Sequence, residues 1–233
     1  MKTEAAQTLA NMAQEGCNWD DITREGAIPG LVALVGGETE KQKHQAARAL
    51  EKLSLNSRSS TVIVDSGGIA PILKLLQSGT DCHKGHGASI VASLVVDAAN
   101  HEEIVREGGI PPLVALVRQG TKRAKKCAAT ALANMATSMG NRSKIADAGA
   151  ISPLVALLRN GTKHQKEQAA RALGNLAINN AANKIAMSNH GAIGLLEVFS
   201  RTGKGSQKRS AATLLEPMDK HGGSSEKRMR HEE

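Results

Sequence analysis

The chain has 233 residues and a formal net charge of +8, and Trp19 and Phe199 are its only aromatic residues. An interior almost without rings must be built from Leu, Ile, Val and Ala, which suits packed helices better than an ordinary globular domain of this length. No apolar stretch has the length of a membrane span, and the three cysteines show no paired spacing. We therefore expect a soluble protein of a reducing compartment, in the cytoplasm, the nucleus or both.

A glycine followed by an apolar run occurs five times along the chain. These glycines are Gly26, Gly67, Gly108, Gly149 and Gly191, and their spacings are 41, 41, 41 and 42 residues. A fixed period in the low forties with helical patterning indicates stacked helical units. The sequence therefore predicts an all-α solenoid over residues 1–217. Its predicted units are a partial repeat at 3–14 and full repeats at 19–56, 59–97, 100–138, 141–179 and 183–216.

Residues 3–14 match the third helix of a unit whose first two helices are missing. The ends of a solenoid need polar caps, and this helix leaves Leu9 and Met12 without a predicted neighbour on its N-terminal side. We expect a longer protein, a partner or another copy of the chain at this end.

The next two units differ in their third helices. The first, 19–56, has a capping box at 39–42, where a threonine hydroxyl and a glutamine side chain satisfy the first amides of the helix. The second, 59–97, has Gly85 and Gly87 inside its third helix, and each weakens a helix by about 0.5–1 kcal/mol relative to alanine. We expect that helix to start late or to kink.

The unit 141–179 shows the pattern most clearly. Gly149 is expected to end the first helix in a left-handed conformation, with Ser152 as N-cap and Pro153 as the first residue of the second helix. The third helix opens with a capping box at 162–165 and is rich in alanines that permit close approach by the next unit. The last unit is stopped by Pro217, and the charged residues 218–233 are predicted to be a disordered tail.

The phrases GAISPLVALL at 149–158 and AARALGNLA at 169–177 resemble the hallmarks of the armadillo repeat family. More narrowly, the repeats look like those of plant U-box proteins and of vacuolar-protein-8-like proteins. The resemblance implies a right-handed superhelix of stacked helix triplets, whose third helices line a concave groove that binds extended peptides.

The sequence contains no complete motif for catalysis or for cofactor binding. The segment around Gly203 and Gly205 lacks the first glycine and the hydroxyl of a phosphate-binding loop. Cys82, His83 and His86 offer zinc ligands, but a closed site needs four and no second cluster completes it. No nucleophile elbow is present. We expect a protein that is not an enzyme, with no cofactor, no metal site and no small-molecule substrate.

Positive charge is concentrated on the predicted third helices. Lys122, Arg123, Lys125 and Lys126 open one of them, although cations at a helix N-terminus oppose the macrodipole. One explanation is a solvated basic rim that maintains solubility. The other, which we favour, is a groove suited to an extended acidic segment of a protein partner.

The family resemblance implies an asparagine ladder on the third helices that binds peptide backbone. The matching positions are Asn11, Lys52, Ser93, Asn134, Asn175 and Pro217, of which three keep asparagine. An asparagine here could instead satisfy the following loop. The positions where import adaptors of the family carry tryptophan hold Gln7, Arg48, Ser89, Thr130, Arg171 and Thr213, so a nuclear-import role is disfavoured. The predicted groove residues are Asn11, Arg48, Lys52, Ser93, Lys126, Thr130, Asn134, Arg171 and Asn175.

Two further functions stay open. The chain could be the substrate-recruiting armadillo portion of a larger ubiquitin ligase, since its repeats look like those that follow a U-box. Nucleic-acid binding rests on charge alone, and the predicted groove offers no aromatic ring on which a base could stack.

Overall fold

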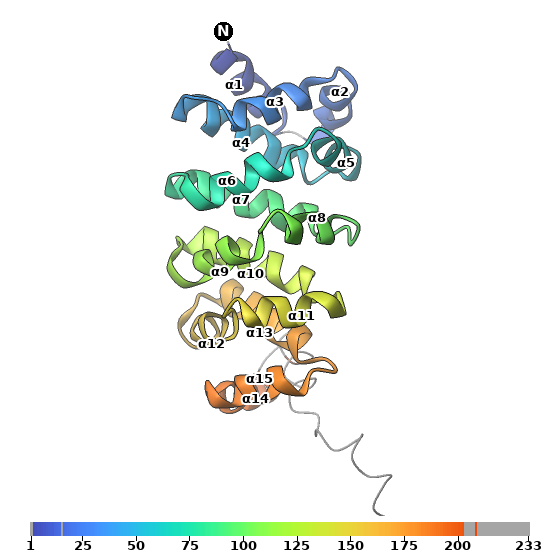
Figure 1. Cartoon of the computed structure of the whole chain (residues 1–233). Helices are drawn as coiled ribbons and strands as arrows, with labels where there is room; N and C mark the ends of the chain where they lie inside the picture. The colour runs from blue at the N-terminus through green and yellow to red at the C-terminus, as the bar shows by residue number, and fades with distance from the viewer. Residues whose placement is uncertain (1, 15, 203–207, 209–233) are drawn as a thin grey trace, which may run out of the picture.

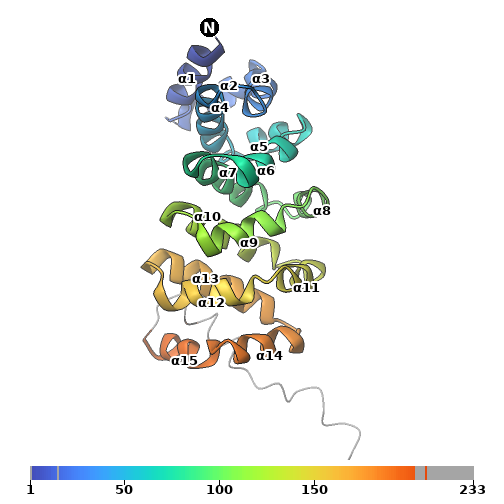
Figure 2. The same cartoon turned by 60° about the vertical axis from the view of Figure 1, so that its left-hand side comes forward.

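A computed structural model of the chain describes residues 2–14, 16–202 and 208. The predicted third helix of the last unit, its terminating Pro217 and the tail at 218–233 therefore fall outside the described residues, apart from residue 208. Within the described part the chain is all-α, and its helices form layers stacked along one axis, from α1 at one end to α15 at the other (Figures 1 and 2).

Each complete layer is a repeat of three helices in the same order; α1 precedes the first complete layer, and the described part of the last layer is α14 and α15. The first helices are α2 (Trp19–Arg24), α5 (Ser57–Asp65), α8 (Asn100–Arg106), α11 (Met139–Asp147) and α14 (Ala181–Asn189). The second helices are α3 (Ala27–Val35), α6 (Ile69–Ser78), α9 (Ile110–Gln119), α12 (Ile151–Asn160) and α15 (Ala192–Thr202). The third helices are α1 (Lys2–Met12), α4 (Glu40–Leu53), α7 (Asp81–Leu94), α10 (Lys122–Met135) and α13 (Lys163–Ala177). A 3-10 turn at Gly16–Asn18 links α1 to the first complete layer.

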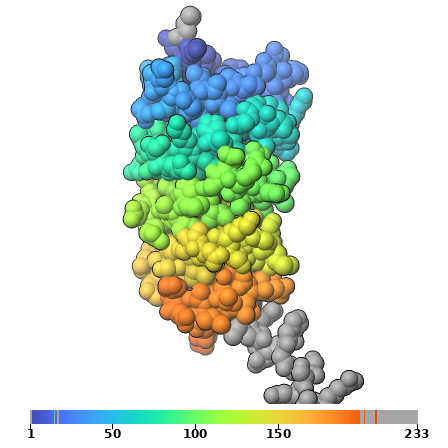
Figure 3. Space-filling view, viewed as in Figure 1, coloured from blue at the N-terminus to red at the C-terminus, as the bar shows by residue number. Residues whose placement is uncertain are grey.

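Helices of one kind stack on one another. The third helices contact each other in the order α1, α4, α7, α10, α13, and the second helices in the order α3, α6, α9, α12, α15. Alanines on the third helices allow this close stacking, and Ala131, Ala169 and Ala172 are fully buried. In the space-filling view each layer lies directly on the next (Figure 3). The core is therefore a continuous apolar column without a single centre, as expected for a solenoid.

The five repeat-marking glycines all adopt the predicted left-handed conformation. Their φ angles lie between 71° and 76°. At Gly149 the amide donates to the carbonyl of Ala146, and the amide of Ala150 donates back to Ile145, so the chain reverses within two residues. A residue with a Cβ is disfavoured at this φ, which explains why glycine recurs at every junction between first and second helices.

The predicted start of the second helix in the fourth repeat is wrong by two residues. Helix α12 begins at Ile151, its N-cap is Ala150, and Ser152 makes no capping bond. The reversal at Gly149 already aims the chain into the helix, and the carbonyl of Ala150 accepts from Leu154. Pro153 is thus the third helical residue, where its missing N–H would have had no intrahelical partner.

The expectation of a late start for the third helix of the second repeat is also wrong. Helix α7 runs without interruption from Asp81, directly after its N-cap Thr80, whose side chain accepts from the His83 amide. A Cβ at Gly87 would lie 3.1 Å from Leu76 Cδ2, so this glycine lets α6 and α7 pack closely. The packing gained there offsets the lower helix propensity.

Polar side chains at the start of the first helices cap the third helices that precede them. The Nδ2 of Asn18, Asn100 and Asn141 donates to the carbonyl six residues earlier, at distances of 3.2, 2.8 and 3.2 Å. Buried Arg142 donates to the carbonyls of Ala136 and Thr137, and to that of Ile178 in the next junction. These bonds satisfy carbonyls that helix ends leave without intrahelical donors.

No single helix among the described residues is long and apolar enough to cross a membrane. Together, α5 and α6 reach that length, but the pair is bent by 87°.

Candidate functional site

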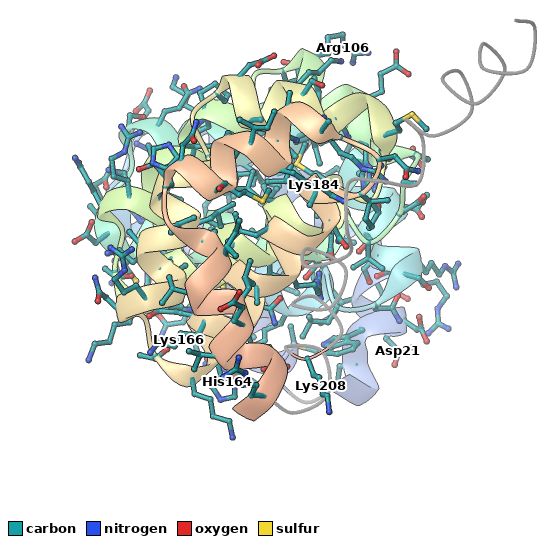
Figure 4. All side chains as sticks on the ribbon, turned by 90° about the horizontal axis from the view of Figure 1, so that it is seen from below. Asp21, Arg106, His164, Lys166, Lys184 and Lys208 are labelled. Carbon is teal, nitrogen blue, oxygen red and sulfur yellow. The ribbon has the colours of Figure 1, made fainter. Side chains whose placement is uncertain are left out.

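All nine predicted groove residues lie on third helices. They are Asn11 on α1; Arg48 and Lys52 on α4; Ser93 on α7; Lys126, Thr130 and Asn134 on α10; and Arg171 and Asn175 on α13. Successive third helices contact one another, so equal positions on them share one face of the stack. Figure 4 shows His164 and Lys166 of α13 on the opposite side from Arg106 of α8. The stacking therefore brings residues about 40 positions apart onto one surface.

A hollow of about 480 Å³ opens on this surface between α7, α10 and α13. Five of the predicted residues line it: Ser93, Lys126, Thr130, Asn134 and Arg171. Asn11, Arg48, Lys52 and Asn175 are not part of the hollow; the first three lie toward the N-terminal end of the stack, and Asn175 lies one turn beyond Arg171 on α13.

The groove arginines bind the ladder asparagines of the preceding repeat. Arg171 donates a hydrogen bond to Asn134 Oδ1, and Arg48 donates to Asn11 Oδ1 at 3.1 Å. In both pairs the two residues are separated by 37 positions, so the same contact is made at two levels of the stack. Burial of the Arg171 guanidinium lowers its pKa from the ordinary value, although it stays charged. These two contacts hold the guanidinium groups of Arg48 and Arg171 in place on the surface formed by the third helices.

The amide groups of two ladder asparagines bind backbone within the solenoid. Asn134 Nδ2 donates to the Ala92 carbonyl at 3.3 Å, and Asn175 Nδ2 donates to the Ala133 carbonyl at 2.7 Å. Both acceptors lie in the last turn of the preceding third helix, where carbonyls lack intrahelical donors. The asparagines thus cap the helix of the repeat before, and not the loop after. Each amide retains a second N–H, because an amide nitrogen carries two.

Ser93 and Thr130 occupy groove positions without extending a donor outward. The Ser93 hydroxyl donates to the Ser89 carbonyl at 3.2 Å, and the Thr130 hydroxyl donates to the Lys126 carbonyl at 2.9 Å. Both are bonds within one helix. These side chains therefore leave space in the hollow between the charged and amide groups.

The basic residues that open α10 divide into two kinds. Lys126 is exposed and lines the hollow, whereas Arg123 forms an ion pair with Glu51 of α4, two repeats earlier. Gly85 of α7, the helix between α4 and α10, lies beside this ion pair: a Cβ added to Gly85 would lie 3.8 Å from Arg123 Cδ. Arg123 is thus paired within the protein, whereas Lys126 borders the hollow.

Glu51 also binds His86 of α7, with 2.6 Å between its Oε2 and Nδ1 of the ring. Burial alone would raise the pKa of Glu51, but hydrogen bonds from His86, Arg123 and Ser89 outweigh it and hold the pKa at about 2. The carboxylate is therefore charged at neutral pH. The members of this network come from three different repeats, so no local sequence pattern indicates it.

Comparisons with known proteins agree with this geometry. Residues 138–178 match the family model for the Armadillo/beta-catenin-like repeat. Among solved structures, a designed armadillo repeat protein superposes with a TM-score of 0.85 at 23% identity, covering 92% of each chain. The chain folds as an armadillo-repeat solenoid.

Two other solved structures superpose on this armadillo solenoid over most of their length. An engineered protein matches with a TM-score of 0.83 at 29% identity, covering 92% of this chain and 88% of that one. A designed armadillo repeat protein in complex with the peptide (KR)4 matches with a TM-score of 0.80 at 24% identity, covering 91% of each chain. No curated protein sequence matches the chain. The narrower resemblance to U-box and vacuolar-protein-8-like repeats stays a prediction.

Proposed function

We propose that the armadillo solenoid is a non-enzymatic interaction module that holds an extended acidic segment of a partner protein along its third helices. The observation that carries the proposal is the repeated Arg–Asn contact. At two levels of the stack, an arginine is fixed beside an asparagine on the same surface. Together they present a charge for a carboxylate and an amide for a peptide backbone.

The spacing of these groups supports an extended ligand. Each level of the stack contributes one ladder position, and the hollow between α7, α10 and α13 lies beside the lower Arg–Asn pair. An extended chain places a side chain on each face every second residue, so successive levels can meet successive side chains. Exposed Lys126 at the edge of the hollow adds a further positive charge.

Charge determines which peptide we expect. The related designed protein was solved with (KR)4, a basic peptide. In this chain, Arg48 and Arg171 occupy the groove, and a basic peptide would meet like charges there. We therefore expect the opposite preference, with complementary charges increasing the association rate and excluding basic partners.

A fluorescence-polarisation assay tests the proposal. Labelled acidic peptides and a (KR)4 peptide are titrated with the full chain at two salt concentrations, and we expect binding of the acidic peptides only, weakening as salt increases. Asn134→Ala combined with Arg171→Glu should weaken binding about ten-fold or more, because it removes the amide and places a negative charge where we expect an acidic side chain of the peptide.

The matched control for this variant is Arg118→Glu. Arg118 is exposed on the second helix α9 and is not part of the hollow, so this change alters net charge equally without altering the groove. Unchanged acidic-peptide affinity in the folded groove variant, or equal loss in the control, would refute a specific groove.

A further inference from the structure

Three potential metal ligands from two repeats meet at the N-terminal ends of α4 and α7. They are His44 of α4 and Cys82 and His86 of α7, and one ligand atom from each lies within 4.8 Å of the others. The sequence showed only the Cys82–His86 segment and no residue to complete a site. Stacking α7 on α4 supplies His44, which is 38 positions from Cys82 in the chain.

We propose that the His44–Cys82–His86 cluster is a divalent metal site, with Zn²⁺ as the ion it fits best. One thiolate and two imidazoles form a set of soft and borderline ligands, which favours zinc over magnesium or calcium. Three protein ligands leave a fourth tetrahedral position for water or for a group of a bound partner.

Two of the three distances between ligand atoms fit tetrahedral coordination. Cys82 Sγ lies 3.6 Å from His44 Nδ1 and 3.6 Å from His86 Nε2. With metal–sulfur and metal–nitrogen bonds of about 2.3 Å and 2.0–2.1 Å, a tetrahedral angle places sulfur and nitrogen about 3.5 Å apart. Both sulfur–nitrogen distances therefore already suit an ion, and the nitrogen atoms of the two histidines lie within 4.8 Å of each other. On binding, the thiol proton of Cys82 leaves to solvent and the metal keeps its charge of +2.

His86 is held in the orientation that a metal ligand needs. The Glu51 carboxylate accepts a hydrogen bond from Nδ1 of the ring at 2.6 Å, so Nε2 carries the lone pair directed at Cys82. A carboxylate behind the ligating histidine is the usual outer partner of protein zinc sites. Arg123 in turn fixes Glu51 by an ion pair. Both His86 and Glu51 are well shielded, with side chains 7% and 12% exposed.

The cluster is also accessible to an ion. Cys82 is exposed to solvent, whereas His86 is buried and His44 is half-buried. His44 lies one helical turn before Arg48 on α4, so the cluster borders the surface proposed to bind peptides. The proposal of a metal site does not depend on that function.

Titration with Co²⁺, which reports coordination by its absorption, tests the proposal directly. The full chain, without an affinity tag and freed of metal with a chelator, should bind one Co²⁺ per chain. We expect thiolate-to-cobalt charge-transfer absorption and the intense visible bands of a tetrahedral ion, both removed by adding Zn²⁺. Absence of the charge-transfer absorption at saturating Co²⁺ would overturn the proposal.

Variants identify the ligands. Cys82→Ser should abolish the charge-transfer absorption, and both Cys82→Ser and His44→Gln should weaken Zn²⁺ binding more than ten-fold in competition with a chromogenic chelator. Glu51→Gln should weaken it about 10–100-fold, as outer-shell changes do. His164→Gln is the matched control, because exposed His164 occupies in α13 the position of Cys82 in α7.

Circular dichroism verifies that each variant is folded, and thermal unfolding provides a second measurement. Zn²⁺ should raise the melting temperature of the unaltered chain and of the His164 control, but not of Cys82→Ser, because an ion stabilises only the state that binds it. Wild-type affinity in folded Cys82→Ser or folded His44→Gln would show that the cluster is only hydrogen-bonded, and would overturn the site.

Discussion

Replacement of Asn175 by alanine tests the structural role of the asparagine ladder. Asn175 Nδ2 donates at 2.7 Å to the carbonyl of Ala133, in the last turn of α10. The neighbouring carbonyls of that turn have other donors: Leu132 accepts from Ala136, and Asn134 accepts from Thr137. Ala133 is fully buried, so water does not reach its carbonyl easily once the amide is gone.

The expected cost follows from this burial. A typical intramolecular hydrogen bond contributes about 0.5–1.5 kcal/mol, but leaving a buried acceptor unsatisfied costs about 1–3 kcal/mol. We therefore expect Asn175→Ala to lower the free energy of unfolding by about 1–3 kcal/mol. In a chain of this size, each kcal/mol corresponds to a fall of about 2–4 °C in melting temperature.

Asn11→Ala provides the comparison, because Asn11 occupies the same ladder position but is exposed and accepts a bond from Arg48. An exposed pair contributes at most about 1 kcal/mol, so this variant should stay within about 0.5 kcal/mol of wild type. Urea unfolding followed by circular dichroism measures both. Equal stability of the two variants would refute the reasoning, because it would mean that the Ala133 carbonyl does not depend on Asn175.

Substitutions at four further positions test the local rules of the repeat, each by urea or thermal unfolding. Gly67→Ala should destabilise the protein by about 1–2 kcal/mol, because φ is 71° there; no atom lies within 4 Å of the new Cβ, so a steric clash does not contribute. Gly30→Ala, inside α3 and equally free of clashes, should stabilise it by about 0.5–1 kcal/mol. A change of the same sign in both variants would contradict the conformational argument. Arg142→Met should cost about 3 kcal/mol or more, because three backbone carbonyls at two successive junctions between repeats lose their donor. A neutral result would mean that water replaces the guanidinium. Thr162→Ala should lower the free energy of unfolding by about 0.5–2 kcal/mol, and Thr162→Ser should lower it much less, because the observed capping box needs only the hydroxyl. Similar losses of stability in both variants would show that the methyl group of Thr162 matters through its packing instead.

Local sequence determined the repeat and most of its helices. The glycines mark a reversal that needs a positive φ, and this requirement is local, so their period predicted the layers directly. The capping box at Thr162 was confirmed for the same reason, because both of its partners lie within one turn. The placement of the nine groove residues on third helices followed from the period, since equal positions in stacked units face the same way.

Tertiary structure decided everything that depends on contact between repeats. The glycines of α7 appeared to weaken the helix, but Gly87 admits α6 and the helix remains continuous. The period places Arg171 on the groove surface, but its hydrogen bond to an asparagine one repeat earlier follows only from the stacking. His44 approaches Cys82 only because α4 and α7 are neighbours. A sequence period specifies which positions share a face, but not which side chains meet across it, because that depends on the separation of the helices and on the rotamers that their packing permits.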